Sequence, residues 1–303
     1  MRTKIILFAL MLTGFVSNAQ QDAQFTHYMY NTINVNPAYA GSRGVLSIFG
    51  LHRTQWVGID GAPVTNSASV NSPIGNSNLG VGLSFVNDRI GPTSEYVASA
   101  DVSYTIQTSE NYKLSFGVKA TANIFEFYKN KVNPESQNDP LYQNLRNDFS
   151  PNIGAGIYFH SDKFYVGASV PGLFETTRYD DNSISLSKER SNYYLIGGYV
   201  FDLSPSIKFK PAFLTKVVRG APLQLDVSGN FLIYDKLVLG AAWRWDAAVS
   251  FMAGFQITEG LYIGYGYDLE TTKLRHYNSG SHEIFLRFEL FKRQEKVITP
   301  RFF

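Results

Sequence analysis

The stretch YVASADVSYTI, residues Tyr96 to Ile106, decides the fold of this 303-residue chain. All its even-numbered positions are apolar or aromatic, and its odd positions from Ser99 to Thr105 are all polar. A period of two over about 10 residues predicts a β-strand with one apolar face, and it is typical of strands that span an outer membrane. The same alternation appears at 223–233, 250–257 and 283–290.

The composition favours the same class of protein. Aromatic residues make up 15% of the chain, Gly occurs 25 times, and only 17% of residues are charged, whereas an average soluble domain carries about 25%. The net charge of +2 is too small to indicate a nucleic-acid partner. These values favour an outer-membrane β-barrel over a secreted all-β sandwich, and the absence of Cys argues against a small disulfide-bonded domain.

The N-terminus has the pattern of a secretory signal peptide. Arg2 and Lys4 precede an apolar run over 5–16, and small residues end at Ala19. The run is too short for a membrane-spanning helix, which needs about 20 apolar residues. We therefore expect a signal peptide at 1–19, an N-terminal segment at 20–43, a barrel at 44–291 and a C-terminal tail at 292–303.

Alternation and turn signals predict an all-β, transmembrane, antiparallel outer-membrane β-barrel of about fourteen strands. The expected strands cover 44–56, 64–73, 79–87, 94–106, 113–127, 151–160, 164–170, 192–202, 207–217, 222–233, 237–245, 248–257, 261–269 and 281–291. Connections after even-numbered strands are short, and the long ones (128–150, 171–191 and 270–280) all follow odd-numbered strands. This alternation predicts periplasmic N- and C-termini with the long loops outside, an ordering that a sandwich does not require.

Charged residues on the polar strand faces should point into the lumen. Both signs occur, so the lining does not predict a strongly anion- or cation-selective pore. The expected lumen residues are Asp101, Lys119, Lys208, Lys210, Lys216, Asp226, Arg244, Glu283, Arg287 and Glu289.

The sequence carries no recognisable catalytic constellation. Its five His form no H-E-x-x-H pair, and no lipase-type G-x-S-x-G motif is present. Without Cys, the usual zinc patterns are also missing. We therefore expect a non-enzymatic protein with no cofactor and no metal site.

Several short motifs in the first third are more specific than barrel statistics. They are QF (24–25), HYMYN (27–31), NPAYAG (36–41), RTQWVG (53–58), GAP (61–63) and NDRIGP (87–92). Together they resemble the PorP/SprF family of Bacteroidetes outer-membrane proteins, which is associated with the type IX secretion system. The resemblance extends over essentially the whole mature chain and is strongest in the first third.

The resemblance implies an integral outer-membrane location and type IX secretion components as partners. Some members of the family work with a periplasmic peptidoglycan-associated partner. SprF-like members are linked to export or surface attachment of large adhesins with a type B C-terminal sorting domain, often gliding-motility adhesins. The family is not known for catalysis.

The segment 21–44 is uncharged for most of its length, aromatic and irregular, and it allows three interpretations. It folds into the lumen as a plug, it docks a periplasmic partner, or its NPAYAG part simply forms the turn that begins the first strand. Arg53 and Trp56 are expected to cap the first outer loop through a cation–π or backbone contact, or to touch a client protein.

The leading functional hypothesis is a barrel that docks or retains a secreted adhesin, with loops 128–150 and 171–191 as the client surface. The alternative is a transport barrel, either a passive porin or a FadL-like channel for hydrophobic molecules. The expected partner-binding residues are Tyr28, Asn36, Pro37, Tyr39, Arg53, Gln55, Trp56, Tyr142 and Tyr179.

Overall fold

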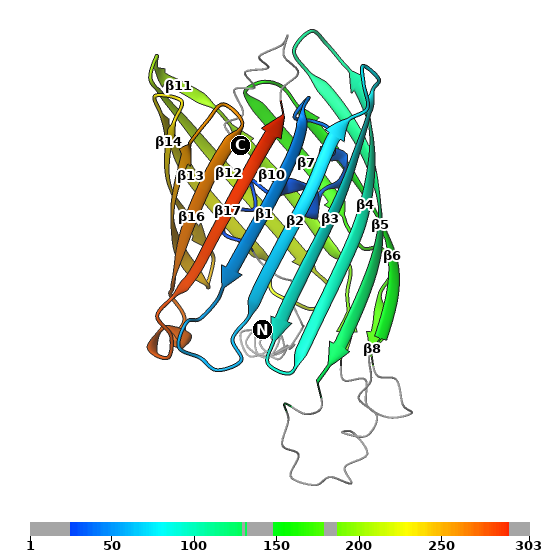
Figure 1. The fold of residues 1–303 in the computed structure, drawn as a ribbon, viewed down its shortest axis with the longest axis vertical. Helices are drawn as coiled ribbons and strands as arrows, with labels where there is room; N and C mark the ends of the chain where they lie inside the picture. Colours follow the sequence, from blue (N-terminus) through cyan, green and yellow to red (C-terminus); the bar gives the residue numbers. More distant parts are fainter. Residues whose placement is uncertain (1–24, 129–130, 132–147, 179–186, 291–303) are drawn as a thin grey trace, which may run out of the picture.

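All the described strands except two short ones close into one antiparallel barrel (Figure 1). The computed structural model describes residues 25–128, 131, 148–178 and 187–290. The barrel strands are β1 (Leu46–Thr54), β2 (Val64–Pro73), β3 (Leu79–Ile90), β4 (Thr93–Gln107), β5 (Lys113–Phe127), β6 (Asp148–His160), β7 (Phe164–Val170), β10 (Asn192–Tyr199), β11 (Phe201–Ser204), β12 (Ile207–Val218), β13 (Gln224–Ile233), β14 (Leu237–Arg244), β15 (Ala248–Gln256), β16 (Leu261–Glu270) and β17 (Ser281–Leu290).

The described strands occupy fourteen positions in the ring, as the alternation predicts. β10 and β11 share one position because both pair with β12. The first and last strands close the ring, with Leu46 opposite Leu290 and Thr54 opposite His282. Among the described barrel strands, closure leaves no edge exposed to lipid, where no water could satisfy unpaired backbone groups.

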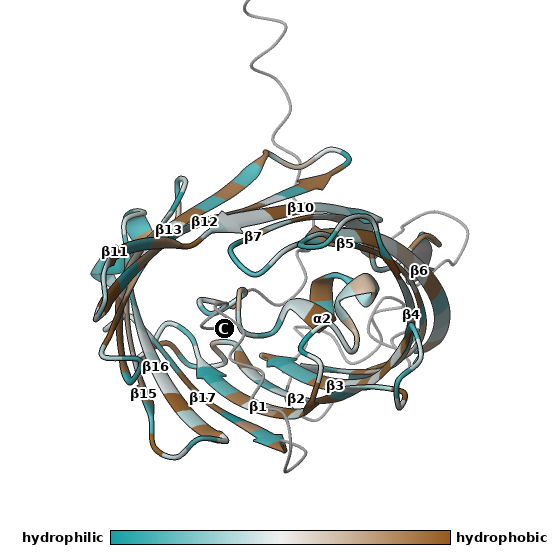
Figure 2. Cartoon of the chain, turned by 90° about the horizontal axis from the view of Figure 1, so that it is seen from above, coloured by the Kyte–Doolittle hydropathy of each residue, from teal (hydrophilic) through white to brown (hydrophobic). Residues whose placement is uncertain are grey.

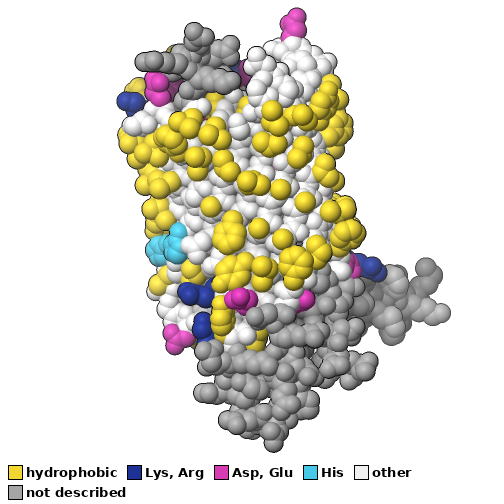
Figure 3. Space-filling model, turned by 45° about the vertical axis from the view of Figure 1, so that its right-hand side comes forward, with side chains coloured by type: hydrophobic (Ala, Val, Ile, Leu, Met, Phe, Trp, Pro, Cys, Tyr) yellow, Lys and Arg dark blue, Asp and Glu magenta, His cyan; other side chains and the backbone are white. Residues whose placement is uncertain are grey.

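The two faces of each strand differ as expected for a membrane-spanning barrel. In β4, Val102 and Tyr104 are 48% and 49% exposed on the outside, whereas Asp101 and Ser103 are buried inside. Figure 3 shows the hydrophobic side chains spread over the wall, with the charged ones gathered toward the two ends. The apolar exterior is therefore the surface that faces lipid.

The connections divide the barrel into two ends. At the first, here called the short-turn end, the strands are joined through 74–78, 108–112, 161–163, 205–206, 234–236 and 257–260. At the other, here called the loop end, the connections include 55–63, 171–191 and 271–280. The loop end also has short connections, since β3 and β4 are joined by Gly91 and Pro92 alone.

The second long loop contains a feature that the alternation did not predict. β8 (Thr176–Arg178) and β9 (Ser187–Glu189) form a separate two-stranded hairpin at the loop end. Among the described residues, no helix is long and apolar enough to cross a membrane. The predicted signal peptide at 1–19 and tail at 292–303 lie outside the described residues.

The interior of the barrel is occupied by residues 25–45, here called the lumen segment. Figure 2 shows its short helix α2 (Thr32–Val35) inside the ring of strands, and a 3₁₀ turn, η1 (Pro37–Tyr39), follows. The buried hydrophobic cluster of the molecule is the contact between this segment and the wall: Met29, Tyr30 and Ile33 lie in the same cluster as Phe285 and Tyr262.

A charge on the lipid face should destabilise the barrel. Val118 lies near the middle of β5 and is 60% exposed. We expect Val118→Arg to lower the free energy of unfolding by about 2–4 kcal/mol, since a basic side chain at the bilayer midplane loses its hydration. Denaturant titration of the protein in lipid vesicles measures this change. Tyr277→Arg, at an exposed loop-end position, is the control, and an equal cost at both positions would contradict the assignment of the lipid face.

Candidate functional site

The lumen segment crosses the barrel from the loop end to the short-turn end. At its start, the carbonyl oxygen of Phe25 accepts a hydrogen bond from Arg244 Nη2 at 3.2 Å, and Arg244 is the last residue of β14, at the loop end. Near its finish, the Arg43 guanidinium pairs with Glu289, which lies at the short-turn end of β17. The segment therefore follows the length of the lumen.

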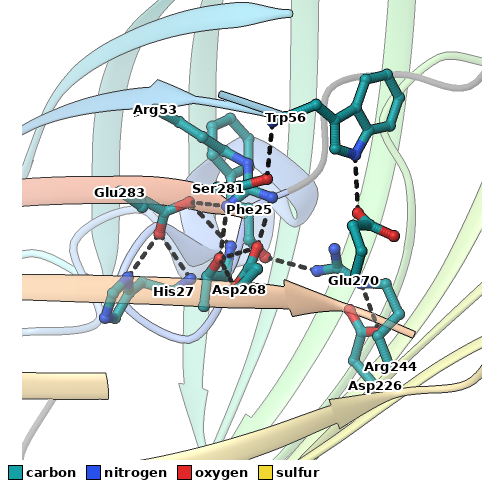
Figure 4. A network of polar contacts seen from close by, with 11 residues as sticks. Phe25, His27, Arg53, Trp56, Asp226, Arg244, Asp268, Glu270, Ser281 and Glu283 are labelled. Atoms are coloured by element: carbon teal, nitrogen blue, oxygen red, sulfur yellow. Dashed lines mark hydrogen bonds and ion pairs between the residues drawn. The ribbon is translucent and has the colours of Figure 1, made fainter. Parts of the chain in front are cut away.

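The Glu283 carboxylate anchors the segment at the loop end (Figure 4). Its two oxygens accept hydrogen bonds from the backbone N–H of Thr26 at 2.9 Å and of His27 at 2.8 Å. His27 Nδ1 lies 2.6 Å from Oε1 of the same carboxylate, and since an ionised carboxylate only accepts, Nδ1 donates. Asp268 adds to this anchor by accepting from the Thr26 hydroxyl at 2.8 Å. The segment thus supplies donors that these two buried carboxylates need.

Arg53 lies between the two carboxylates and completes the anchor. Its Nη2 donates to Asp268 at 2.6 Å, and its Nη1 donates to Glu283 at 3.3 Å and to the Thr26 hydroxyl at 2.6 Å. The expectation that Arg53 caps the first outer loop is therefore wrong. β1 extends to Thr54, and its odd-numbered side chains point inward, so Arg53 follows Leu51 into the lumen.

Trp56 lies beyond this cluster and fixes the first connection at the loop end, residues 55–63. Its indole Nε1 donates to Glu270 at 2.7 Å, and its backbone N–H donates to the Ser281 hydroxyl at 3.2 Å (Figure 4). Val57 continues the contact, with its N–H bonded to the Gly280 carbonyl at 2.9 Å. The loop 55–63 is thereby tied to the connection between β16 and β17.

Glycines in the wall let the rest of the segment approach the strands closely. A Cβ atom added at Gly117 would lie 2.2 Å from the backbone nitrogen of Ala38, and one added at Gly80 would lie 2.2 Å from the carbonyl oxygen of Ala40. Both distances are far inside van der Waals contact. Larger residues at these wall positions would displace the segment. The glycines of β3 and β5 therefore leave the space that the backbone of the segment occupies.

Tyrosines fill the remaining space and find polar partners. The Tyr30 hydroxyl lies 2.9 Å from that of Tyr262, and the Tyr28 hydroxyl lies 3.3 Å from Ser228 Oγ. Both side chains are buried, and burial disfavours a charged phenolate, so the two phenols are neutral. The rings therefore contribute apolar contact area without adding a charge to the lumen.

The structure divides the expected partner-binding residues into three groups. Tyr28, Asn36, Pro37, Tyr39 and Arg53 are buried in the lumen, so none of them can reach a partner while the segment is in place. Gln55 and Trp56 are partly exposed at the loop end. Tyr142 and Tyr179 lie outside the described residues.

Three members of the anchor, Thr26, His27 and Asp268, were not among the expected site residues, although His27 begins the motif HYMYN. Asp268 is inward by the alternation of β16, where Tyr262 and Asp268 share the buried face. This alternation could have identified Asp268 as an inward-facing residue from the sequence. His27 and Thr26 precede any regular element, and their pairing with residues some 250 positions away has no local sequence pattern.

Removing the anchor's cation should destabilise the protein strongly. Arg53→Met leaves the buried carboxylates of Asp268 and Glu283 without their guanidinium partner, and breaking such an ion pair from one side typically costs about 3–5 kcal/mol. Denaturant unfolding in vesicles should show this loss. Arg275→Met, at an exposed loop-end position, should change the free energy of unfolding little, and Arg53→Met with Asp268→Asn should recover part of the loss. A wild-type stability for Arg53→Met would contradict this account of the anchor.

The sequence matches the family model described as "Type IX secretion system membrane protein PorP/SprF" over residues 17–288. Among curated proteins, none matches this sequence.

Two solved barrels share the architecture. The outer membrane protein Omp33 of Acinetobacter baumannii aligns with a TM-score of 0.50 and 8% identity, over 81% of this chain and 98% of that one. The TodX deltaS2S3 mutant, a monoaromatic hydrocarbon channel, aligns with a TM-score of 0.50 and 10% identity, over 91% of this chain and 98% of that one. At these identities the likeness shows the fold alone.

The barrel fold and the family match together place the protein in the outer membrane as an integral component. The matched range takes in all the barrel strands except the last residues of β17. The chain belongs to the PorP/SprF family of type IX secretion system membrane proteins.

Proposed function

We propose that this barrel is a non-enzymatic scaffold that docks or retains a secreted adhesin with a type B C-terminal sorting domain at the cell surface. The observation that carries the proposal is the lumen segment. It occupies the space that a transported solute would use, and buried hydrogen bonds and ion pairs with the wall hold it there. A barrel closed in this way is better suited to presenting a surface than to passing solutes.

The loop end is the natural surface for a large partner. Its connections rise from a closed barrel, and loops on a rigid scaffold commonly carry recognition. Trp56 ties the first loop to the β16–β17 connection through Glu270 and Ser281, which reduces the conformational freedom that a partner would otherwise have to restrict on binding. Gln55 and Trp56 are partly exposed there and remain proposed partner contacts.

Two further partners follow from the family. Type IX secretion components would deliver the adhesin, and a periplasmic peptidoglycan-associated protein would meet the opposite end of the barrel. With the long loops outside, that end is the short-turn end, where β17 finishes and the chain continues into 291–303. The periplasmic location of this end is part of the proposal.

The alternative function is a transport barrel. A structurally similar protein is described as a monoaromatic hydrocarbon channel, although the likeness extends only to the fold. For this chain to transport solutes, the lumen segment would have to leave its glycine-lined path and break the contacts of Glu283. We therefore rank docking ahead of transport.

A gentle-detergent pull-down of the tagged barrel from native outer membranes tests the proposal. We expect near-stoichiometric recovery of a large protein with a type B sorting domain, identified by mass spectrometry. Replacing 132–147 by a Gly-Ser linker of equal length should reduce that recovery at least tenfold. The same linker inserted into the turn 108–112, at the short-turn end, is the control and should leave recovery unchanged.

Two outcomes would contradict docking. The first is recovery of the barrel alone from membranes that contain abundant adhesin. The second is fast permeation of small solutes through liposomes that carry the purified wild-type barrel, because this would show an open lumen and favour transport.

A further inference from the structure

Polar side chains interrupt the apolar outer wall near the loop end, where β17, β1, β2 and β3 are paired side by side. They alternate with inward-facing neighbours, so they point out of the barrel toward the membrane. Figure 3 shows His side chains on the part of the wall nearer the loop end, with Lys or Arg side chains beyond them. Five of these polar residues, here called the wall patch, are His282, His52, Thr54, Asn66 and Arg89.

The wall patch lies at the edge of the apolar band. On β3 the outward row passes from Phe85, which is 44% exposed, to Asn87 and then to Arg89 near the end of the strand. On β17 the outward row passes from Ile284, which is 45% exposed, to His282. Because the apolar band faces the acyl chains, polar side chains at its edge meet the headgroups of the lipids.

Arg89 supplies a positive charge that the chain does not neutralise. Its side chain is exposed. Among the described residues, none forms an ion pair or a hydrogen bond with its guanidinium, including the exposed Asp60 on the connection 55–63. A guanidinium stays charged under all ordinary conditions and offers five N–H donors. This part of the wall therefore favours an anion.

Asn66 places amide donors beside this charge. Since Val64 lies opposite Arg89, Asn66 is the diagonal neighbour of Arg89 on the same face, and such side chains are about 7–8 Å apart. Asn66 Oδ1 lies 2.8 Å from His52 Nδ1, and the other ring nitrogen of His52 lies 3.1 Å from the Thr54 hydroxyl. With the amide oxygen accepting from the ring, the Nδ2 group is left to donate, and no described residue accepts from it.

His282 adds a further donor two strands away from Asn66. The Tyr265 hydroxyl lies 2.6 Å from His282 Nδ1. A phenol donates more readily than it accepts, so Nδ1 accepts and Nε2 carries the proton. No described residue accepts from this Nε2–H group. His282 lies opposite Thr54 on β1, so two strand spacings, about 10 Å, separate it from Asn66.

We propose that the wall patch binds the phosphate group of a membrane lipid headgroup. Two phosphate oxygens match the fork of the Arg89 guanidinium, and a third can accept from Asn66 Nδ2. His282 would donate to another oxygen of the same headgroup. The source is a lipid because the wall patch continues directly into the apolar band, against which the acyl tails of a bound lipid would pack, whereas a free anion would gain nothing from that surface.

Native mass spectrometry of the purified full-length barrel, released from detergent micelles at increasing lipid concentration, tests the proposal. Dioleoylphosphatidylglycerol is the probe. Dioleoyl monogalactosylglycerol, which has the same tails and no phosphate, is the comparison lipid. We expect the barrel to retain the phosphatidylglycerol with at least tenfold higher affinity than the galactolipid, and this affinity should fall as the salt concentration is raised. Inorganic phosphate that competes at the same concentration as the lipid would overturn the assignment to a lipid.

Two patch variants and one matched control complete the design. Arg89→Gln and Asn66→Leu should each weaken phosphatidylglycerol binding roughly tenfold, as expected for loss of a hydrogen bond to a charged group. Arg219→Gln is the control, since Arg219 is also exposed at the loop end but follows β12, on another side of the ring. It should bind as the wild type does. Matching far-ultraviolet circular dichroism spectra and thermal transitions would establish that all three variants are folded.

Three results would overturn the lipid site. They are equal affinity for the galactolipid, wild-type affinity in both patch variants, and a loss in the Arg219 control as large as that in Arg89→Gln. None of these results depends on whether the pull-down recovers an adhesin. The lipid site concerns the wall and the docking proposal concerns the loops, so each can fail while the other stands.

Discussion

The buried carboxylate of Glu283 is the constraint on which the interior of this barrel depends. It lies on β17, where the strand alternation turns it inward, and a charge in that position loses its hydration. Four donors compensate: the N–H groups of Thr26 and His27, the His27 ring and the Arg53 guanidinium. Three of the four come from the lumen segment. The wall therefore depends on donors from the lumen segment to compensate a buried carboxylate, and the lumen segment depends on that carboxylate to stay in place.

This mutual dependence connects the fold to the proposed function. Outward apolar residues fit the barrel to lipid, and inward polar residues would suit a water-filled channel, yet here they serve to hold a length of the chain's own backbone. Gly80 and Gly117 accept that backbone at distances that no side chain would allow. Under the proposed function, an occupied lumen would give up a transport route and would provide a stiff platform whose loop end could contact a partner.

The sequence predicted the strands and the charged residues that face the lumen, but it did not predict which of those residues hold the lumen segment, for a physical reason. A strand's faces are set by a period of two, so Asp101 and Val102 could be assigned to opposite sides from their neighbours alone. Arg53 lay within the expected first strand 44–56, but it was interpreted as a cap on the following loop, whereas the alternation of β1 makes it an inward-facing residue. The anchor could not be predicted because Thr26 meets Glu283 across 257 positions, and only the closed ring brings them together. The β8–β9 hairpin was missed because two three-residue strands carry too short a pattern.

A designed disulfide between the lumen segment and the wall tests the central claim most directly. The chain has no Cys, and the Cβ of Ala40 lies 3.6 Å from the position that a Cβ on Gly82 would take, within the range of natural disulfides. The nearby Ile33 terminal methyl must rotate aside, which a flexible side-chain end can do. In Ala40→Cys/Gly82→Cys, mild oxidation of native outer membranes should form the crosslink in nearly every molecule, read as a mobility shift of denatured protein that reductant reverses. Two cysteines that stay reduced and react freely with maleimide would show that the segment does not occupy the lumen.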